Sequence, residues 1–197
     1  MNYSIITISR EHGSGGRLIA EKLSEKLGIP CYDKEIIDLT AKGADISAKY
    51  VKNAENRKKL SFLYNLNINV NNLPIDDQIY VSQCNVIQAL AQKGSCIIIG
   101  RCADYVLRER KDCLRVFVYA PLEQRVRRMK NTYGEANNAV EIVLNKCDKN
   151  RAEYYNYYAN SEHPWGARQN YHLMIDTSIG IDEACTLILT AFQGEVI

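Results

Sequence analysis

The sequence has no long apolar run, no surplus of one charge and no signal segment. No stretch approaches the ~18 apolar residues that a membrane span requires, and residues 1–9 carry neither a basic segment nor a small-residue cleavage site. The 25 basic and 23 acidic residues leave a net charge of +2, which is too small to favour nucleic acid or a membrane surface. We therefore expect a cytoplasmic protein whose partners are small molecules, with no nucleic-acid or membrane partner.

The cysteines lack the spacing of metal or redox sites. The chain has 7 of them, an odd number, and no two form a C-x-x-C pair. Several lie in apolar stretches, where an unpaired thiol behaves as a small hydrophobic side chain. We expect reduced, largely buried cysteines and no metal site built from sulfur.

The length and the pattern of apolar residues predict one domain with an α/β fold. A chain of 197 residues can fill one core and is short for two domains. Short apolar runs alternate with segments of helical periodicity, which favours a central parallel sheet covered by helices on both faces. The expected strands are 3–9, 96–99, 114–120 and 171–176, and the expected helices are 19–27, 76–93, 140–158 and 182–192.

The most informative segment is the glycine-rich loop SREHGSGGR at residues 9–17, between the first expected strand and the first helix. Gly13, Gly15 and Gly16 leave room for backbone N–H groups to converge on an anion, and the start of the helix adds partial positive charge. This pattern predicts a phosphate-binding loop. The alternative is an ordinary strand-to-helix turn in which Ser14 caps the helix.

Basic side chains in this loop favour phosphate binding over the ordinary turn. Arg17 lies in the first helical turn, where the helix dipole disfavours a cation by about 0.3–1 kcal/mol. Arg10 and His12 bring further basic groups to the same amides, and a bound phosphate would balance them.

The loop departs from the P-loop pattern G-x-x-x-x-G-K-[ST]. When Gly13 and Gly15 are aligned with its later glycines, Arg10 stands at the first glycine, Gly16 at the lysine and Arg17 at the hydroxyl residue. We expect Arg17 to supply the charge of the missing lysine. The usual Ser or Thr ligand of magnesium is absent from its position, and no other residue is assigned as a metal ligand.

Further motifs are spread over nearly the whole chain. Besides residues 5–17, they are YDKE at 32–35, GRCAD at 100–104, RVRR at 125–128 and DKNRA at 148–152. In this order, they resemble the cytidylate kinase-like family. The resemblance implies a three-layer P-loop kinase fold over residues 1–197, with a helical monophosphate-binding insertion at about 42–74 and a helical lid at about 125–165. It also implies ATP and Mg²⁺ as cofactors.

The resemblance implies roles for three sets of residues. The expected ATP-binding residues are Arg10, His12, Gly13, Ser14, Gly15, Gly16 and Arg17. The expected catalytic residues are Arg17, Arg125, Arg128 and Arg151, since phosphoryl transfer mainly needs positioning and neutralisation of charge. The expected substrate-binding residues are Asp33, Lys34, Arg101, Asp104 and Asp148.

Each of these assignments has a structural alternative. Judged alone, Arg101 would cap the end of its strand and Asp104 would start the following helix. Asp148 would serve only as a salt-bridge partner that holds Arg151. Arg127 and Lys130 are interpreted as part of a solvated helix surface.

The predicted activity is ATP-dependent phosphoryl transfer to a nucleoside monophosphate, with CMP or dCMP as first choice from the resemblance. Two alternatives remain open. The missing P-loop lysine and hydroxyl favour a catalytically silent, nucleotide-binding regulatory protein, whereas the arginines of the lid favour an enzyme. A kinase of another small metabolite would use the same apparatus.

Overall fold

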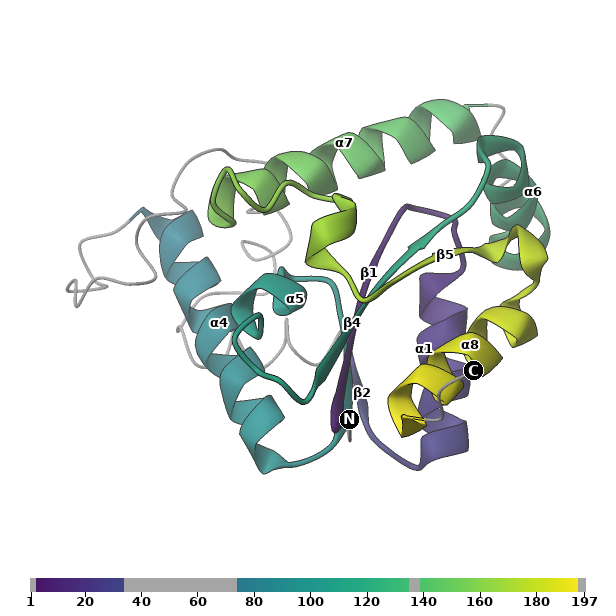
Figure 1. Ribbon diagram of the computed structural model, residues 1–197. Coiled ribbons are helices and arrows are strands. Elements are labelled where there is room, and N and C mark those ends of the chain that lie inside the picture. The colour runs from purple at the N-terminus through teal and green to yellow at the C-terminus, as the bar shows by residue number, and fades with distance from the viewer. Residues whose placement is uncertain (1–2, 34–73, 135–138, 195–197) are drawn as a thin grey trace.

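A parallel sheet of five strands forms the centre of the protein (Figure 1). The computed structural model describes residues 3–33, 74–134 and 139–194. The strands are β1 (Ile5–Arg10), β2 (Cys31–Tyr32), β3 (Cys96–Ile99), β4 (Cys113–Tyr119) and β5 (Leu173–Asp176), in the spatial order β2-β3-β1-β4-β5. Every pairing between them is parallel, which confirms the predicted sheet.

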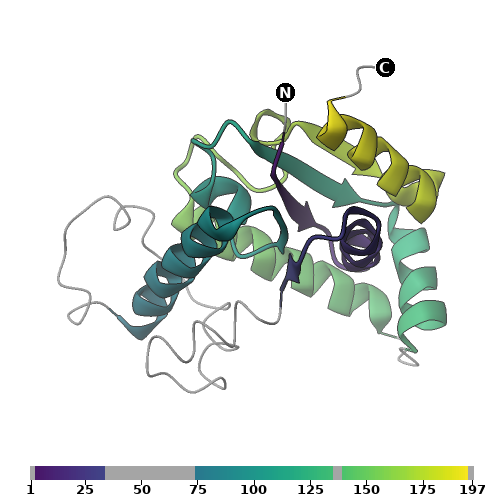
Figure 2. The ribbon, with the colours of Figure 1, turned by 90° about the horizontal axis from the view of Figure 1, so that it is seen from below.

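Helices cover both faces of this sheet (Figures 1 and 2). They are α1 (Gly16–Leu27), α4 (Ile75–Lys93), α5 (Ala103–Val106), α6 (Leu122–Tyr133), α7 (Val140–Tyr158) and α8 (Ile181–Gln193). Short 3-10 turns, η3 (Arg168–Asn170) and η4 (Thr177–Ile179), flank β5. The three-layer α/β fold is thus confirmed. The predicted insertion, apart from Pro74, and Lys34 lie outside the described residues.

The core consists of two layers of side chains, one on each face of the sheet. Ile5 and Ile98 pack with residues of α4, α5 and α7, whereas Ile6 and Ile97 pack with residues of α1 and α8. This alternation is the two-residue period of a strand, and both faces are apolar because both are covered. The continuous apolar runs that predicted buried strands therefore have a direct structural cause.

The helical periods in the sequence correspond to the faces that the helices bury. In α1, the predicted positions Ile19, Ala20 and Leu23 are buried, and α7 begins and ends at the predicted residues. The sequence pattern missed β2, which has only two residues and pairs with β3 alone.

The cysteines take their places in this core. Those at 84, 96, 102, 113 and 185 are buried, Cys31 and Cys147 are half-buried, and all are free thiols, as predicted. Among the described helices, none combines the length and apolarity that a membrane crossing needs.

The carboxyl ends of β1, β2 and β3 meet at one edge of the sheet, since the strands are parallel neighbours. β1 leads into the glycine loop, β2 into Asp33 and β3 into Gly100. α7 crosses this edge (Figure 1). In open α/β sheets this edge is where ligands bind.

The two core layers lead to a stability prediction. Ile97 is fully buried in β3, so Ile97→Ala should lower the free energy of unfolding by about 2–5 kcal/mol. Ile142→Ala is the matched control, because Ile142 on α7 is 70% exposed and should change stability by less than about 0.5 kcal/mol. Urea denaturation followed by circular dichroism measures both, and equal losses would contradict the assigned core.

Candidate functional site

The glycine loop runs through residues 11–15, between β1 and α1. Gly13 and Gly15 have φ of 77° and 90°, a left-handed conformation that residues with side chains rarely adopt. Space is also short, since a Cβ on Gly15 would lie 2.5 Å from Cδ1 of Ile181. Gly15 is the N-cap of α1, and no side chain caps this helix. The first N–H groups of α1 are therefore left to water or a ligand.

Arginines of α6 hold the loop by its carbonyl oxygens. Arg125 donates to the carbonyl oxygen of His12 at 3.2 Å. Arg128 donates to the carbonyl oxygen of Gly13 at 2.8 Å. In a trans peptide the N–H of the next residue points the opposite way. The N–H of Gly13 therefore points away from Arg125, as in an anion-binding nest, whereas the N–H of Ser14 donates to the carbonyl oxygen of Glu11 at 3.4 Å.

Ser14 anchors the loop and does not cap the helix. Its hydroxyl donates to the carbonyl oxygen of Glu11 at 2.8 Å, and its side chain is buried. Its own carbonyl oxygen accepts from the hydroxyl of Thr177 at 2.7 Å, which turns the N–H of Gly15 the opposite way. The alternative of an ordinary turn capped by Ser14 is wrong in this respect, because the cap position belongs to Gly15.

Asp148 on α7 connects this helix to the loop. Its carboxylate accepts from the N–H of His12 at 2.6 Å and forms an ion pair with Arg125. Arg151 lies one helical turn later, with Nη1 at 3.9 Å from the same carboxylate, and donates to the carbonyl oxygen of Arg10 at 3.1 Å. The structure thus brings Asp148, Arg125, Arg128 and Arg151 to the loop, with Arg125 as the closer partner of Asp148.

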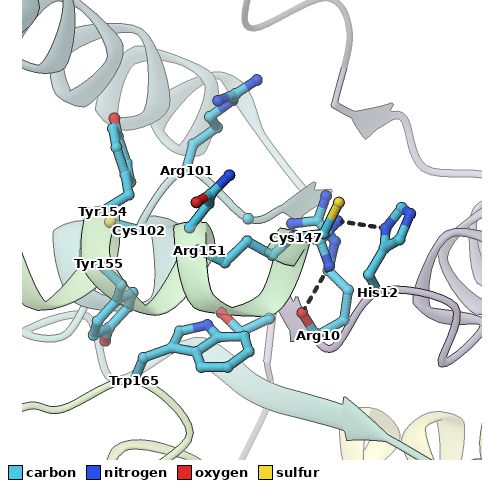
Figure 3. A pocket seen from close by; sticks show the side chains of 12 residues that line it. Arg10, His12, Arg101, Cys102, Cys147, Arg151, Tyr154, Tyr155 and Trp165 are labelled. Carbon is cyan, nitrogen blue, oxygen red and sulfur yellow. Dashed lines mark hydrogen bonds between the residues drawn. The ribbon is translucent and has the colours of Figure 1, made fainter. Parts of the chain in front are cut away.

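A pocket of about 320 Å³ opens beside the loop, at the carboxyl edge of the sheet (Figure 3). Arg10 and His12 line it from the β1 side, Arg101 from the end of β3, and Arg151 from α7. The remaining lining residues are Ser9, Gly100, Cys102, Cys147, Asn150, Tyr154, Tyr155 and Trp165. Figure 3 shows Arg151 reaching from α7 toward Arg10 and His12. The pocket therefore combines a basic wall with an aromatic one.

The basic wall is short of negative charge. Asp33 forms an ion pair with Arg10 at 3.9 Å. Burial, followed by the charge of Arg151, lowers the pKa of both Arg10 and His12, and burial likewise lowers the pKa of Arg151. Desolvated cations that repel one another favour a bound anion. This pocket suits a phosphate or carboxylate group.

A strained turn presents Arg101 to the pocket. Arg101 and Cys102 have φ of 57° and 56°, a conformation that costs non-glycine residues energy. They follow Gly100, so the chain bends sharply at the end of β3 before α5 begins. Such strain is concentrated at functional sites, and here it places an arginine in the pocket lining.

Asp104 lies behind the pocket and is absent from its lining. Its carboxylate is buried and accepts hydrogen bonds from Ser9 Oγ at 3.0 Å and from the Tyr155 hydroxyl at 2.6 Å. Burial raises the pKa of Asp104, against these hydrogen bonds. Asp104 is also at the start of α5, in line with the structural alternative for this residue.

Arg17 is not brought to the pocket. Its side chain is 66% exposed and pairs with Glu21 one helical turn later, at 2.9 Å. This hydrogen bond raises the pKa of Arg17 and offsets the charge that the helix dipole disfavours. The expectation that Arg17 takes over from the P-loop lysine therefore finds no support in its position.

Sequence reasoning missed the aromatic wall. Tyr154, Tyr155 and Trp165 line the pocket, yet none of them is among the site residues that the sequence predicts. The missed signal is helical spacing, because Cys147, Arg151 and Tyr154 share one face of α7. Trp165 carried no such signal, since only the return of the chain from α7 brings it to the pocket.

The residues that the structure describes do not form a protein-held magnesium site. Position 17 is an arginine in place of the usual hydroxyl, and the Ser14 hydroxyl is bonded to the backbone. Within the described ranges, no group of three or more His, Cys, Asp or Glu side chains is arranged to hold a metal ion.

Residues 5–179 match the cytidylate kinase-like family. Among solved structures, an uncharacterized protein from Eubacterium ventriosum is 28% identical, with a TM-score of 0.72 and coverage of 95% of this chain and 97% of that one. A gluconokinase from Sinorhizobium meliloti is 12% identical, with a TM-score of 0.58 and coverage of 98% of this chain and 93% of that one. Shikimate kinase from Acinetobacter baumannii is 14% identical, with a TM-score of 0.54 and coverage of 99% of this chain and 96% of that one. No curated protein sequence matches. The fold is therefore that of the P-loop kinases.

The contact between α7 and the loop leads to a prediction for Asp148. Asp148→Ala leaves the Arg125 guanidinium, 9% exposed, without its main counter-charge, and should lower the free energy of unfolding by about 3 kcal/mol. Glu123→Ala is the matched control, because it removes the partner of Arg127 in an exposed ion pair on α6, the helix that also carries Arg125. It should lower the free energy of unfolding by less than about 0.5 kcal/mol. Urea titrations of both variants measure the difference, and similar losses would show that Asp148 is no anchor.

His12 makes stability depend on pH. Burial and Arg151 lower its pKa in the folded state, so the unfolded chain takes up a proton that the folded chain rejects. Stability should therefore fall as the pH drops through about 6.5, with a slope of at most about 1.4 kcal/mol per pH unit from this group. His12→Asn should flatten the decrease between pH 7.5 and 5.5 in urea titrations. Parallel curves for the two proteins would exclude His12 as the cause.

Proposed function

Because the chain belongs to the cytidylate kinase-like family, we propose that it transfers the γ-phosphoryl group of ATP to a small anionic acceptor, with CMP and dCMP as first candidates. The observation that carries this proposal is the arrangement of Arg10, Arg101 and Arg151 in one pocket, directly beside the glycine loop. A loop that suits phosphate and a basic pocket next to it are what a donor and an acceptor phosphate need.

The loop would hold the phosphates of ATP. The N–H groups of Gly13 and Gly15 point away from the anchors of the preceding carbonyl oxygens, and those at the start of α1 have no side-chain cap. This is the geometry in which backbone amides and a helix N-terminus bind phosphate without reorganising. The anchors would keep the loop in this form when no nucleotide is bound.

The basic wall of the pocket would align the acceptor and neutralise the transferred group. An acceptor oxygen forms a bond to the γ-phosphorus, while the bond from that phosphorus to the β,γ-bridging oxygen breaks and ADP leaves. For CMP the attacking phosphate oxygen carries no proton near neutral pH, so no general base is required. Positioning and charge then account for the catalysis, as in phosphoryl transfer generally.

The aromatic wall would receive the apolar part of the acceptor. Trp165 and Tyr154 flank the side of the pocket away from the glycine loop (Figure 3). Flat aromatic side chains can stack on a nucleobase. The volume of about 320 Å³ lies at the lower end of the range for small-ligand sites, which suits a monophosphate better than a larger acceptor.

Magnesium would enter with ATP. Mg²⁺ is commonly held by substrate phosphates with few protein ligands. Since the residues present do not fit a protein-held site, we assign the neutralisation of charge to the arginines and no step to a protein-bound metal.

A kinase of another anionic metabolite is the second candidate, and the position of Asp104 favours it. The resemblance assigns this carboxylate to the substrate, yet it is buried and bonded to Ser9 and Tyr155. It is therefore not offered to a cytosine amino group in this structure. A carboxylate-bearing acceptor would bind the same arginines without it.

The decisive experiment incubates the full chain with ATP and Mg²⁺ and one acceptor at a time. The acceptors are CMP, dCMP, UMP, AMP and GMP, and also gluconate and shikimate because structural neighbours carry those names. Product is separated by ion-exchange chromatography, and CDP or dCDP is the expected product. Product from a non-nucleotide alone would favour the second candidate. Nucleotide binding by calorimetry without any product would instead favour the silent regulatory protein.

Arg151 supplies a sharper prediction about catalysis. Its guanidinium should contact the transferred group, so Arg151→Ala should lower kcat at least tenfold, equal to about 1.4 kcal/mol, with a smaller rise in KM. Arg127→Ala is the control, because Arg127 on α6 is 67% exposed and pairs with Glu123. Steady-state kinetics with the acceptor found above measures both. An unchanged kcat in a folded Arg151→Ala variant would make Arg151 structural only.

A further inference from the structure

The backbone conformation at position 16 does not require glycine, but the space around it does. Gly16 is the first residue of α1, and its φ is not among the positive values. A Cβ at this position would lie 2.9 Å from Cβ of Arg10, closer than real Cβ atoms approach, and 3.1 Å from Cγ, which is tighter than most real contacts. Position 16 is therefore glycine because the side chain of Arg10 lies over it.

A second glycine borders the other end of the same side chain. A Cβ on Gly100 would lie 2.0 Å from Nη1 and 3.1 Å from Cζ of Arg10. The stem of Arg10 thus passes over Gly16, and its guanidinium rests on Gly100 at the end of β3. One arginine occupies the space next to two glycines that come from different elements.

Position 16 is where the P-loop pattern has its lysine. A lysine here would begin in the space that Cβ and Cγ of Arg10 already occupy. Arg10 in this position and a lysine at position 16 therefore exclude one another. The positive charge beside the loop comes from Arg10 at the end of β1, and not from a lysine at the start of α1.

We propose that Arg10 takes the place of the P-loop lysine and binds the terminal phosphate of the donor, between the glycine loop and the acceptor pocket. This inference rests on the proposed function, for which it names the residue that replaces the missing lysine. It also removes one of the two sequence arguments for a catalytically silent protein, the missing lysine, and leaves the missing hydroxyl as the other.

The surroundings of the Arg10 guanidinium fit this role. Its ion pair with Asp33 is 3.9 Å long, well beyond the 2.7–2.9 Å of a charge-assisted hydrogen bond, so among the described residues this carboxylate leaves N–H groups that can bind a phosphate. Burial and the charge of Arg151 lower the pKa of Arg10, which a bound anion would reverse. The planar fork of arginine can also contact two phosphate oxygens at once.

The first test measures binding and turnover separately. Arg10→Met keeps most of the stem over Gly16 and removes the charge. It should weaken binding of inorganic tripolyphosphate at least tenfold by calorimetry and lower kcat/KM for ATP by a similar factor or more. Arg127→Ala, which removes an exposed arginine, should change neither. Binding and turnover equal to those of the native protein would overturn the proposal.

The second test exchanges the two positions. Gly16→Lys alone should lose tripolyphosphate binding, because the new side chain collides with Arg10. Arg10→Gly alone should also lose this binding, because it removes the guanidinium charge. The double variant Arg10→Gly/Gly16→Lys restores a P-loop lysine and should bind at least tenfold more tightly than either single variant. Circular dichroism confirms that each variant is folded. A folded double variant no better than the single ones would overturn the pairing.

These tests separate this inference from the proposed function. A native protein that transfers phosphoryl groups and does not need Arg10 would contradict the inference alone. A native protein that binds tripolyphosphate through Arg10, yet phosphorylates no acceptor, would contradict the proposed function and support the inference.

Discussion

The orientation of the glycine loop is the constraint on which the rest of the site depends. A peptide group that offers its carbonyl oxygen to one side must offer the neighbouring N–H to the other. Arg125, Arg128 and Thr177 take the carbonyl oxygens of residues 12–14. The amides are thus arranged by side chains of α6 and η4, far from the loop in sequence.

Side chains of α7 likewise join the helices of the predicted lid to the glycine loop and to β1. Asp148 binds the loop amide of His12 and the Arg125 side chain, and Arg151 binds the carbonyl oxygen of Arg10. In the structure described here these helices already lie against the loop. These arginines hold the loop, and under the proposed function they would also neutralise the charge of a bound nucleotide. Nucleotide binding would then be coupled to the position of α6 and α7. Hydrogen exchange in these helices reports such coupling.

Positive charge in the pocket is the second feature on which the proposed function depends. Arg10, Arg101 and Arg151 come from three separate elements and meet where parallel strands end. Their repulsion costs stability in the free protein, and a bound anion would offset it. The fold alone says little about which anion, since gluconokinase and shikimate kinase share it at low sequence identity. Under the proposed function, the choice of acceptor would depend on the side chains of this pocket.

The sequence by itself determined the α/β class, most strands and helices, the buried cysteines and the glycine loop as the candidate site. These follow from local chemistry: strand and helix periods, glycines that permit left-handed backbone, and a helix start whose amides suit an anion. Only the tertiary structure decided which basic residues reach the pocket. Arg17 and Arg10 are equally near the loop in sequence, yet α1 turns Arg17 toward Glu21 and solvent, whereas β1 directs Arg10 over Gly16 to Gly100. Spacing along the chain cannot reveal that choice, because it depends on the space left by Gly100, which follows another strand, β3.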